Sequence, residues 1–92
     1  MIKSFKHKGL SALFYTGSAR KVQAKHAARL NLILSMLNAA THAGQMNGPG
    51  LRLHPLKGKP AGRYAVWVDE NFRVIFGFEA TNAMEVDYGD YH

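Results

Sequence analysis

Two histidines in this sequence stand in settings that suit proton transfer. His54 lies within residues 53–58, where a proline follows it directly and restricts the path of the chain, and His92 is the final residue, after Asp90 and Tyr91. A histidine side chain gains and loses a proton near neutral pH, so it can act as a general base or as a general acid. The plainer interpretation is that a polar C-terminus frays and takes no part in chemistry.

Two cations could accompany these histidines. Lys57 follows His54 closely, and Arg73 should project from the open face of a strand, because the alternating apolar residues beside it point the other way. A planar guanidinium group contacts two phosphate oxygens at once, whereas a lysine supplies a point charge. The plainer interpretation of both residues is an ordinary surface charge.

Together these residue types suit the cleavage of RNA without a metal ion. In that reaction the 2′-hydroxyl attacks the adjacent phosphate, a base takes its proton, an acid protonates the leaving 5′-oxygen, and cations surround the developing charge. Tyr91 could stack on a base or contact a phosphate. Asp90 could orient an imidazole or accept a proton. The sequence does not distinguish which of His54 and His92 is the base.

Charge is distributed unevenly along the chain. Twelve Lys and Arg residues stand against six Asp and Glu residues, a net charge of +6, and every acidic residue lies between Asp69 and Asp90. A field this one-sided attracts polyanions, although a soluble basic surface without a specific ligand is the plainer alternative. The candidate contacts to RNA or to a ribosome are Lys3, Lys6, Lys8, Arg20, Lys21, Lys25, Arg29, Lys59 and Arg63.

The remaining histidines give no sign of a metal site. We interpret His7, His26 and His42 as surface residues, because they lack the close spacing of metal ligands. The chain has no cysteine, which excludes disulfides, thiolate zinc sites and cysteine nucleophiles. We expect no metal and no cofactor.

The first half of the sequence predicts helices. The whole chain has 92 residues, which fit one domain spanning 1–92. A short strand is expected over 2–5, then a helix over 9–14 that stops at Gly17, and a long amphipathic helix over 22–41. The glycines and proline of residues 43–50 predict a mobile loop.

The second half changes to a period of two, which is typical of strands. Strands are expected near 51–54, 63–68, 72–78 and 84–88, with turns at 69–71 and 81–82. Met84, Val86 and Tyr88 should share one face. The predicted fold class is α+β, with two N-terminal helices packed on a mainly antiparallel sheet of about four to five strands. The opposite face of the sheet should be open to ligands.

Nearly the whole chain resembles the HigB-type toxins, a branch of the RelE-like superfamily of bacterial toxin–antitoxin systems. The resemblance rests on the order and spacing of residues 1–5, 8–10, 13–14, 39–41, 53–58, 71–78 and 90–92. It implies the RelE-like microbial RNase fold and a ribosome-dependent mRNA endonuclease that inhibits translation. The functional residues of the family correspond here to His54, Lys57, Arg73, Asp90, Tyr91 and His92.

The resemblance also implies partners. These are a helix-turn-helix antitoxin of the HigA type encoded by the adjacent gene, the 70S ribosome with its mRNA, and operator DNA bound only through the antitoxin complex. The chain departs most from the family pattern around residues 42–50. The sequence has no signal peptide and no apolar stretch long enough to span a membrane, so we expect a cytoplasmic protein.

Two alternatives are left open by the sequence. One is a non-catalytic RNA-binding module, because Phe76-Gly77-Phe78 is similar to the aromatic strand of an RNA-recognition motif. That motif needs a helix between its third and fourth strands. The other is an inactive toxin relative that acts as an antitoxin or as a partner at operator DNA.

Overall fold

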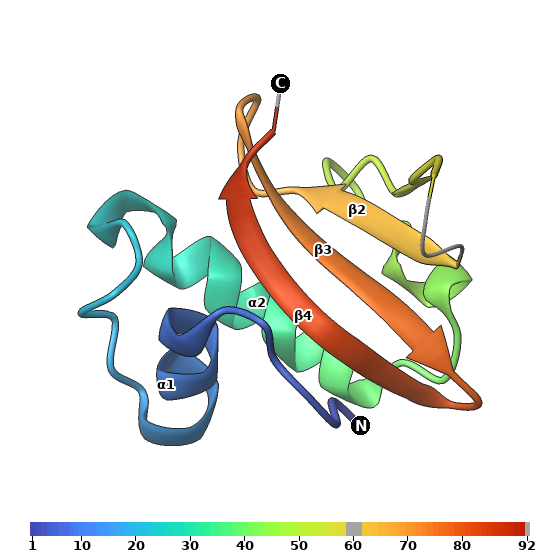
Figure 1. The fold of residues 1–92 in the computed structure, drawn as a ribbon. Coiled ribbons are helices and arrows are strands. Elements are labelled where there is room, and N and C mark those ends of the chain that lie inside the picture. The colour runs from blue at the N-terminus through green and yellow to red at the C-terminus, as the bar shows by residue number, and fades with distance from the viewer. Residues whose placement is uncertain (59–61, 92) are drawn as a thin grey trace.

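A four-stranded antiparallel sheet is the centre of the computed structural model, which describes residues 1–58 and 62–91. The helices are α1 (Lys8–Thr16) and α2 (Ala27–Ala39), with short 3₁₀ helices η1 (Ala24–His26) and η2 (Ala43–Met46). The strands are β1 (His54–Pro55), β2 (Arg63–Trp67), β3 (Phe72–Glu79) and β4 (Asn82–Asp90), in the order β1-β2-β3-β4. Both α-helices cover one face of the sheet (Figure 1), which confirms the predicted α+β class.

The first residues run alongside β4 but do not form a regular strand. Ile2 pairs with Ala83 and Phe5 pairs with Val86, both in parallel orientation. Between these two contacts β4 contains a bulge at Glu85, whose φ of 51° lies in the left-handed region. The bulge interrupts an even ladder, so the strand predicted over 2–5 is present only as two bridges.

Helix α1 has a defined cap at each end. The ring of His7 accepts a hydrogen bond from the backbone N–H of Leu10 at 3.2 Å, and Gly17 closes the helix with φ 77°. His7 is therefore a half-buried helix cap, and its interpretation as a solvated surface residue is wrong. The predicted stop at Gly17 is confirmed.

Helix α2 is shorter than its predicted range of 22–41. It begins at Ala27 after η1 and ends at Ala39, because the backbone of Ala40 is extended. Leu30, Ile33, Leu34 and Leu37 line its buried face. Within the segment predicted as a mobile loop over 43–50, residues 43–46 form a turn of 3₁₀ helix, and the side chain of Met46 packs into the core.

The predicted open face at Arg73 is confirmed. Val66, Val74 and Phe76 are fully buried against the helices, and Arg73 lies on the opposite face. In β4 the bulge changes the alternation, so Ala83 and Val86 are both buried. Met84 is therefore not on the face of Val86 and Tyr88, contrary to the prediction.

Strand β1 has two residues, and only His54 of these belongs to the run predicted over 51–54. Arg52 has a φ of 51°, which breaks the extended backbone before His54. A direct turn joins β3 to β4, so the helix required by an RNA-recognition motif is absent from this described part of the chain. Neither α-helix in residues 1–58 and 62–91 is long and apolar enough to cross a membrane.

Candidate active site

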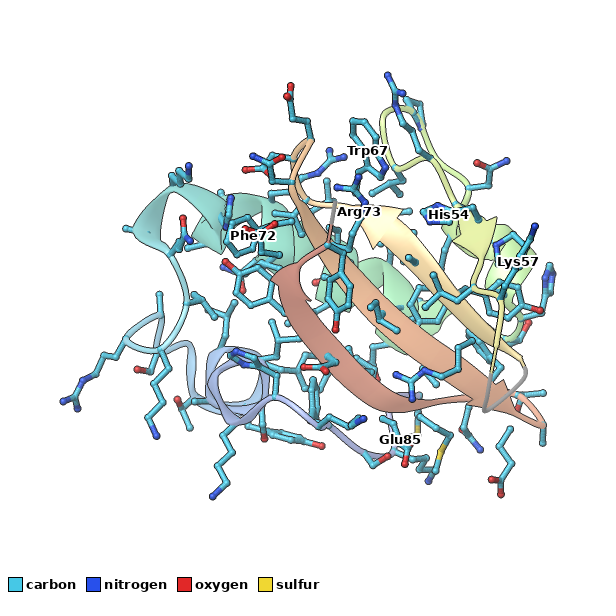
Figure 2. The ribbon with its side chains drawn as sticks, turned by 45° about the horizontal axis from the view of Figure 1, so that its top comes forward. His54, Lys57, Trp67, Phe72, Arg73 and Glu85 are labelled. Carbon is cyan, nitrogen blue, oxygen red and sulfur yellow. The ribbon has the colours of Figure 1, made fainter. Side chains whose placement is uncertain are left out.

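A hollow of about 290 Å³ opens on the face of the sheet that the helices do not cover. Three strands and the segment after β4 contribute to it. Its lining residues are His54, Leu56, Ala65, Arg73, Ile75 and Tyr91. Three residues predicted from sequence therefore meet in one place, and Figure 2 shows His54 and Arg73 on the same side of the sheet.

Strand pairing brings these residues together. His54 lies opposite Ala65, and Ala65 lies opposite Ile75 on β3. Ala65 and Ile75 are buried although they belong to the open face, so they form an apolar floor. Polar groups around an apolar floor are typical of small-ligand sites.

The ring of His54 has a defined tautomer. Its Nδ1 lies 3.0 Å from the carbonyl oxygen of Arg52. A carbonyl oxygen can only accept, so Nδ1 carries the hydrogen and donates it. In the neutral ring the basic lone pair is then on Nε2. The side chain of His54 is exposed and lines the hollow, so this ring can exchange a proton with a ligand there.

The guanidinium group of Arg73 is only partly used within the protein. Its Nη1 donates to the carbonyl oxygen of Asp69 at 2.7 Å and to that of Phe72 at 3.2 Å. Within residues 1–58 and 62–91 no hydrogen bond engages its Nε or Nη2. These remaining N–H groups are available for the oxygens of a phosphate.

Tyr91 is held at the hollow by its backbone. Its N–H donates to the carbonyl oxygen of Asn71 at 2.8 Å, while its side chain is 44% exposed. A Cβ atom on Gly89 would lie 3.1 Å from Cε1 of Tyr91. The glycine at this position therefore leaves space for the tyrosine ring.

The other predicted site residues are placed differently. Lys57 and Asp90 are exposed and do not line the hollow, although Asp90 ends β4 next to Tyr91. His92 and Lys59 lie outside the described residues. The structure therefore brings together His54, Arg73 and Tyr91 from the predicted set.

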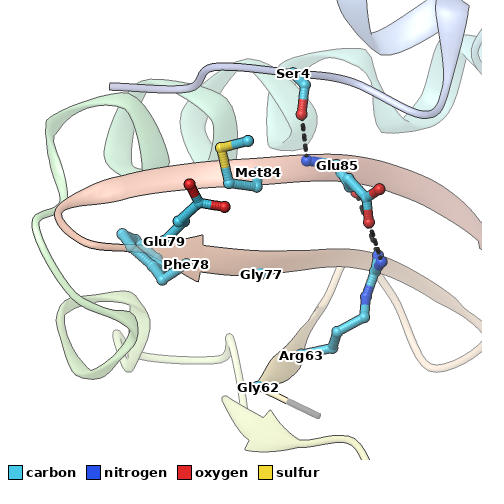
Figure 3. A pocket seen from close by; sticks show the side chains of 8 residues that line it. All are labelled: Ser4, Gly62, Arg63, Gly77, Phe78, Glu79, Met84 and Glu85. Atoms are coloured by element: carbon cyan, nitrogen blue, oxygen red, sulfur yellow. Dashed lines mark hydrogen bonds and ion pairs between the residues drawn. The ribbon is translucent and has the colours of Figure 1, made fainter. Parts of the chain in front are cut away.

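A second hollow, of about 350 Å³, lies at the bulge of β4 (Figure 3). There Arg63 pairs with Glu85 at 3.0 Å, and the hydroxyl of Ser4 accepts from the Glu85 N–H at 2.8 Å. Since the arginine is already neutralised by a carboxylate, this hollow suits a phosphate less well than the one at His54.

The basic residues predicted to contact RNA divide into two groups. Arg63 is engaged by Glu85, and Arg29 is half-buried, with its Nη2 donating to the carbonyl oxygen of Gly50 at 3.0 Å. These two are weaker candidates for an external partner. The exposed members of the predicted set are Lys3, Lys6, Lys8, Arg20, Lys21 and Lys25.

A buried histidine supports the turn between β2 and β3. His26 is only 3% exposed, so its interpretation as a surface residue is wrong. Its Nε2 lies 2.7 Å from Oδ2 of Asp69, and its Nδ1 lies 2.6 Å from the hydroxyl of Tyr88. A carboxylate only accepts, so Nε2 donates to Asp69, and in the neutral ring Nδ1 accepts from Tyr88.

This network reaches the hollow through the backbone of the turn. The other carboxylate oxygen of Asp69 accepts from the N–H groups of Asn71 at 2.9 Å and Phe72 at 2.8 Å. The carbonyl oxygens of the same turn bind Arg73 and the N–H of Tyr91. His26 and Asp69 are therefore positioning residues for two side chains of the hollow. The sequence showed the turn, but it gave no sign that a distant histidine packs beneath it.

The pKa values in this network follow from its hydrogen bonds. The backbone N–H of Phe72, and then the His26 side chain, lower the pKa of Asp69 from 3.8 to about 2. Burial raises the pKa of the Tyr88 hydroxyl above its ordinary value. Asp69 is therefore ionised throughout the physiological range, and Tyr88 keeps its proton.

The lowered pKa of Asp69 predicts how stability falls in acid. A carboxyl group with a depressed pKa in the folded state adds stability above its ordinary pKa, and this contribution is lost as the pH falls from about 4 toward 2. We expect Asp69→Asn to flatten the pH dependence of stability across that window. Urea unfolding at pH 7, 4 and 2.5 measures it, with the exposed neighbour Glu70→Gln as the control. Equal acid sensitivity of Asp69→Asn and the wild-type protein would contradict the prediction.

The fold and the hollow define a class of small α+β protein that carries a histidine, an arginine and a tyrosine on the open face of its sheet, which suits a phosphodiester ligand. Residues 3–92 match the family described as "RelE-like toxin of type II toxin-antitoxin system HigB". The sequence is also 42% identical over 92 residues to the protein named "Endoribonuclease HigB" from Proteus vulgaris, with 100% of both chains aligned. The chain therefore belongs to the HigB-like toxin family, which confirms the resemblance of its motifs.

Proposed function

We propose that this protein is an endoribonuclease that cleaves mRNA on the ribosome and thereby inhibits translation, as the toxin of a type II toxin–antitoxin system. Its family and the name of its Proteus vulgaris relative, "Endoribonuclease HigB", support the ribonuclease activity. The observation that carries the proposal is the meeting of His54, Arg73 and Tyr91 around one hollow. The chemistry of RNA cleavage assigns each of them a role.

The proposed reaction needs no metal ion. The 2′-oxygen attacks the adjacent phosphorus and loses its proton to a base, while the bond to the 5′-oxygen breaks and an acid supplies that oxygen with a proton. The products are a 2′,3′-cyclic phosphate and a 5′-hydroxyl. His54 and His92 form the acid–base pair in this proposal, and the Nε2 of His54 is suited to either role as its protonation state changes.

The remaining side chains act on charge and orientation. Arg73 stabilises the negative charge that develops on the phosphate through its Nε and Nη2 groups. Lys57 adds a positive charge at the edge of the site, and Asp90 orients an imidazole or shares the role of the base. Tyr91 contacts a base or a phosphate from the exposed edge of the hollow.

The proposed partners follow from this function. A type II toxin requires an antitoxin, and we propose a helix-turn-helix protein of the HigA type encoded by the adjacent gene. The 70S ribosome would present the mRNA, and the exposed lysines of residues 1–25 would bind its RNA. Operator DNA would be contacted only through the antitoxin complex. A protein that acts on translating ribosomes belongs in the cytoplasm.

Cleavage of a defined mRNA on translating ribosomes tests the proposal. We expect the wild-type protein to cut the mRNA and His54→Ala to cut it at least about 10²-fold more slowly, because a general acid or base is lost. His42→Ala removes an exposed histidine outside the hollow and is the matched control. Intact mRNA with the wild-type protein would favour the inactive relative, and full activity of His54→Ala would refute the assigned role.

A further inference from the structure

Two arginines stack on the single tryptophan of the chain, at the end of the sheet where the hollow lies. The guanidinium carbon of Arg52 is 4.1 Å from the centroid of the Trp67 ring, and that of Arg73 is 4.3 Å from it. Trp67 is half-buried at the end of β2, and Arg52 is exposed just before β1. Figure 2 shows Trp67 grouped with Arg73 and His54, away from Glu85. Neither Arg52 nor Trp67 was assigned a function from the sequence.

The backbone connects this cluster directly to the hollow. The N–H of Trp67 donates to the carbonyl oxygen of Leu51 at 2.7 Å, which fastens the loop to the end of the strand. The carbonyl oxygen of Arg52 accepts from Nδ1 of His54. Arg52 therefore orients His54 through its backbone while its side chain covers Trp67. Arg73 belongs to both places, because it lines the hollow and also lies over the tryptophan ring.

Among residues 1–58 and 62–91, no carboxylate pairs with the charges of the cluster. Among the described residues the salt bridges are His26 with Asp69 and Arg63 with Glu85, so neither Arg52 nor Arg73 has a carboxylate partner. The negative face of the tryptophan ring offsets part of the repulsion between the two guanidinium groups. Two cations held beside one ring leave a concentrated positive charge that favours an anion such as a phosphate.

We propose that Arg52 and Trp67 bind the nucleotide of single-stranded RNA next to the one whose phosphate is cut. This inference rests on the proposed function and names the substrate contact beside its site. The face of the Arg52 guanidinium, supported by Trp67, stacks on the base, and its edge donates to the adjacent phosphate. Arg73 at the same time faces the scissile phosphate.

Single-stranded RNA fits this surface better than duplex RNA. Stacking needs the face of a base, and bases in a duplex are already stacked on their neighbours. A structured RNA helix would offer only phosphates, for which an aromatic ring gives no advantage. The combination of a ring with two guanidinium groups therefore favours an unpaired nucleotide, as mRNA provides.

The fluorescence of Trp67 tests the proposal directly, because it is the only tryptophan in the sequence. The probe is a short single-stranded RNA with 2′-O-methyl riboses, which cannot be cleaved. We expect saturable quenching of Trp67, and we expect Arg52→Gln to weaken binding about tenfold. His42→Gln, which changes an exposed side chain outside the hollow, should alter the affinity by less than about threefold. Arg52→Lys keeps the charge but loses the planar group, so it should bind nearly as weakly as Arg52→Gln.

Several results would overturn this proposal. Anisotropy of a labelled strand follows RNA binding independently. If it shows binding while the fluorescence of Trp67 stays unchanged, the RNA binds elsewhere. If Arg52→Gln weakens binding no more than His42→Gln does, Arg52 does not contact the RNA, and tighter binding of duplex RNA would favour a structured RNA. The assay uses uncleavable RNA without ribosomes, so it can succeed even if the protein proves to be no nuclease.

Discussion

Replacing Arg73 with alanine should lower the rate of mRNA cleavage by about two to three orders of magnitude. The guanidinium group is the one cation of the described residues that lines the hollow at His54, and its Nε and Nη2 groups are available to the phosphate. Removing a preorganised donor from a developing negative charge has an effect of this size in other enzymes. Single-turnover cleavage of a defined mRNA on ribosomes measures it.

Two further variants separate the role of Arg73 in catalysis from its role in the fold. Arg73→Lys keeps the charge but loses the fork and the stacking on Trp67, so its rate should fall between those of the wild-type protein and Arg73→Ala. His42→Ala removes an exposed side chain outside the hollow and should retain nearly full activity. Circular dichroism must show all three variants folded. Wild-type cleavage by a folded Arg73→Ala protein would remove this residue from the mechanism.

Replacing His26 with alanine should destabilise the protein by about 2–4 kcal/mol. The substitution leaves a cavity under the turn of residues 69–71 and removes the buried partner of both Tyr88 and Asp69. His42→Ala, at an exposed position, should change stability by no more than about 0.5 kcal/mol. Urea unfolding at pH 7 measures both free energies of unfolding.

The His26 variant should also cleave mRNA more slowly while it is still folded. The turn that His26 supports binds Arg73 through the carbonyl oxygen of Asp69 and holds Tyr91 through that of Asn71. His26→Gln retains a polar group that can donate to Asp69, so it should recover part of both stability and activity. A stable His26→Ala protein with wild-type cleavage would show that the network does not position the hollow.

The hydrophobic pattern of this sequence was sufficient to predict most of the fold. The helical spacing around Leu30 and Leu37 and the alternation around Val74 and Phe76 each identified a buried face correctly. The errors lie where tertiary contacts override local pattern. The bulge at Glu85 moves Met84 to the other face, and burial of Met46 orders a segment rich in glycine.

The candidate site was predictable only in part. The chemistry of histidine and arginine indicated His54 and Arg73 as site residues, and the predicted open face of the sheet supported Arg73. Both residues line one hollow. The surface interpretation of His26 is wrong because it rests only on the wide spacing of the histidines, whereas the partners of His26 are 43 and 62 residues away in sequence. The cluster at Trp67 could not be predicted, because the position of Arg52 over its ring depends on a left-handed backbone at Arg52 that no local pattern indicates.

The turn of residues 69–71 also bears on how cells could escape such a toxin. The carbonyl oxygens that hold Arg73 and Tyr91 belong to the same few residues that Asp69 and His26 keep rigid. A substitution that makes this turn less rigid would reduce the activity of the protein although every side chain of the hollow is still present. Cells that survive expression of the toxin would then carry substitutions at His26 or Asp69, outside the hollow. A complete set of hollow residues would therefore not show that such a variant is still toxic.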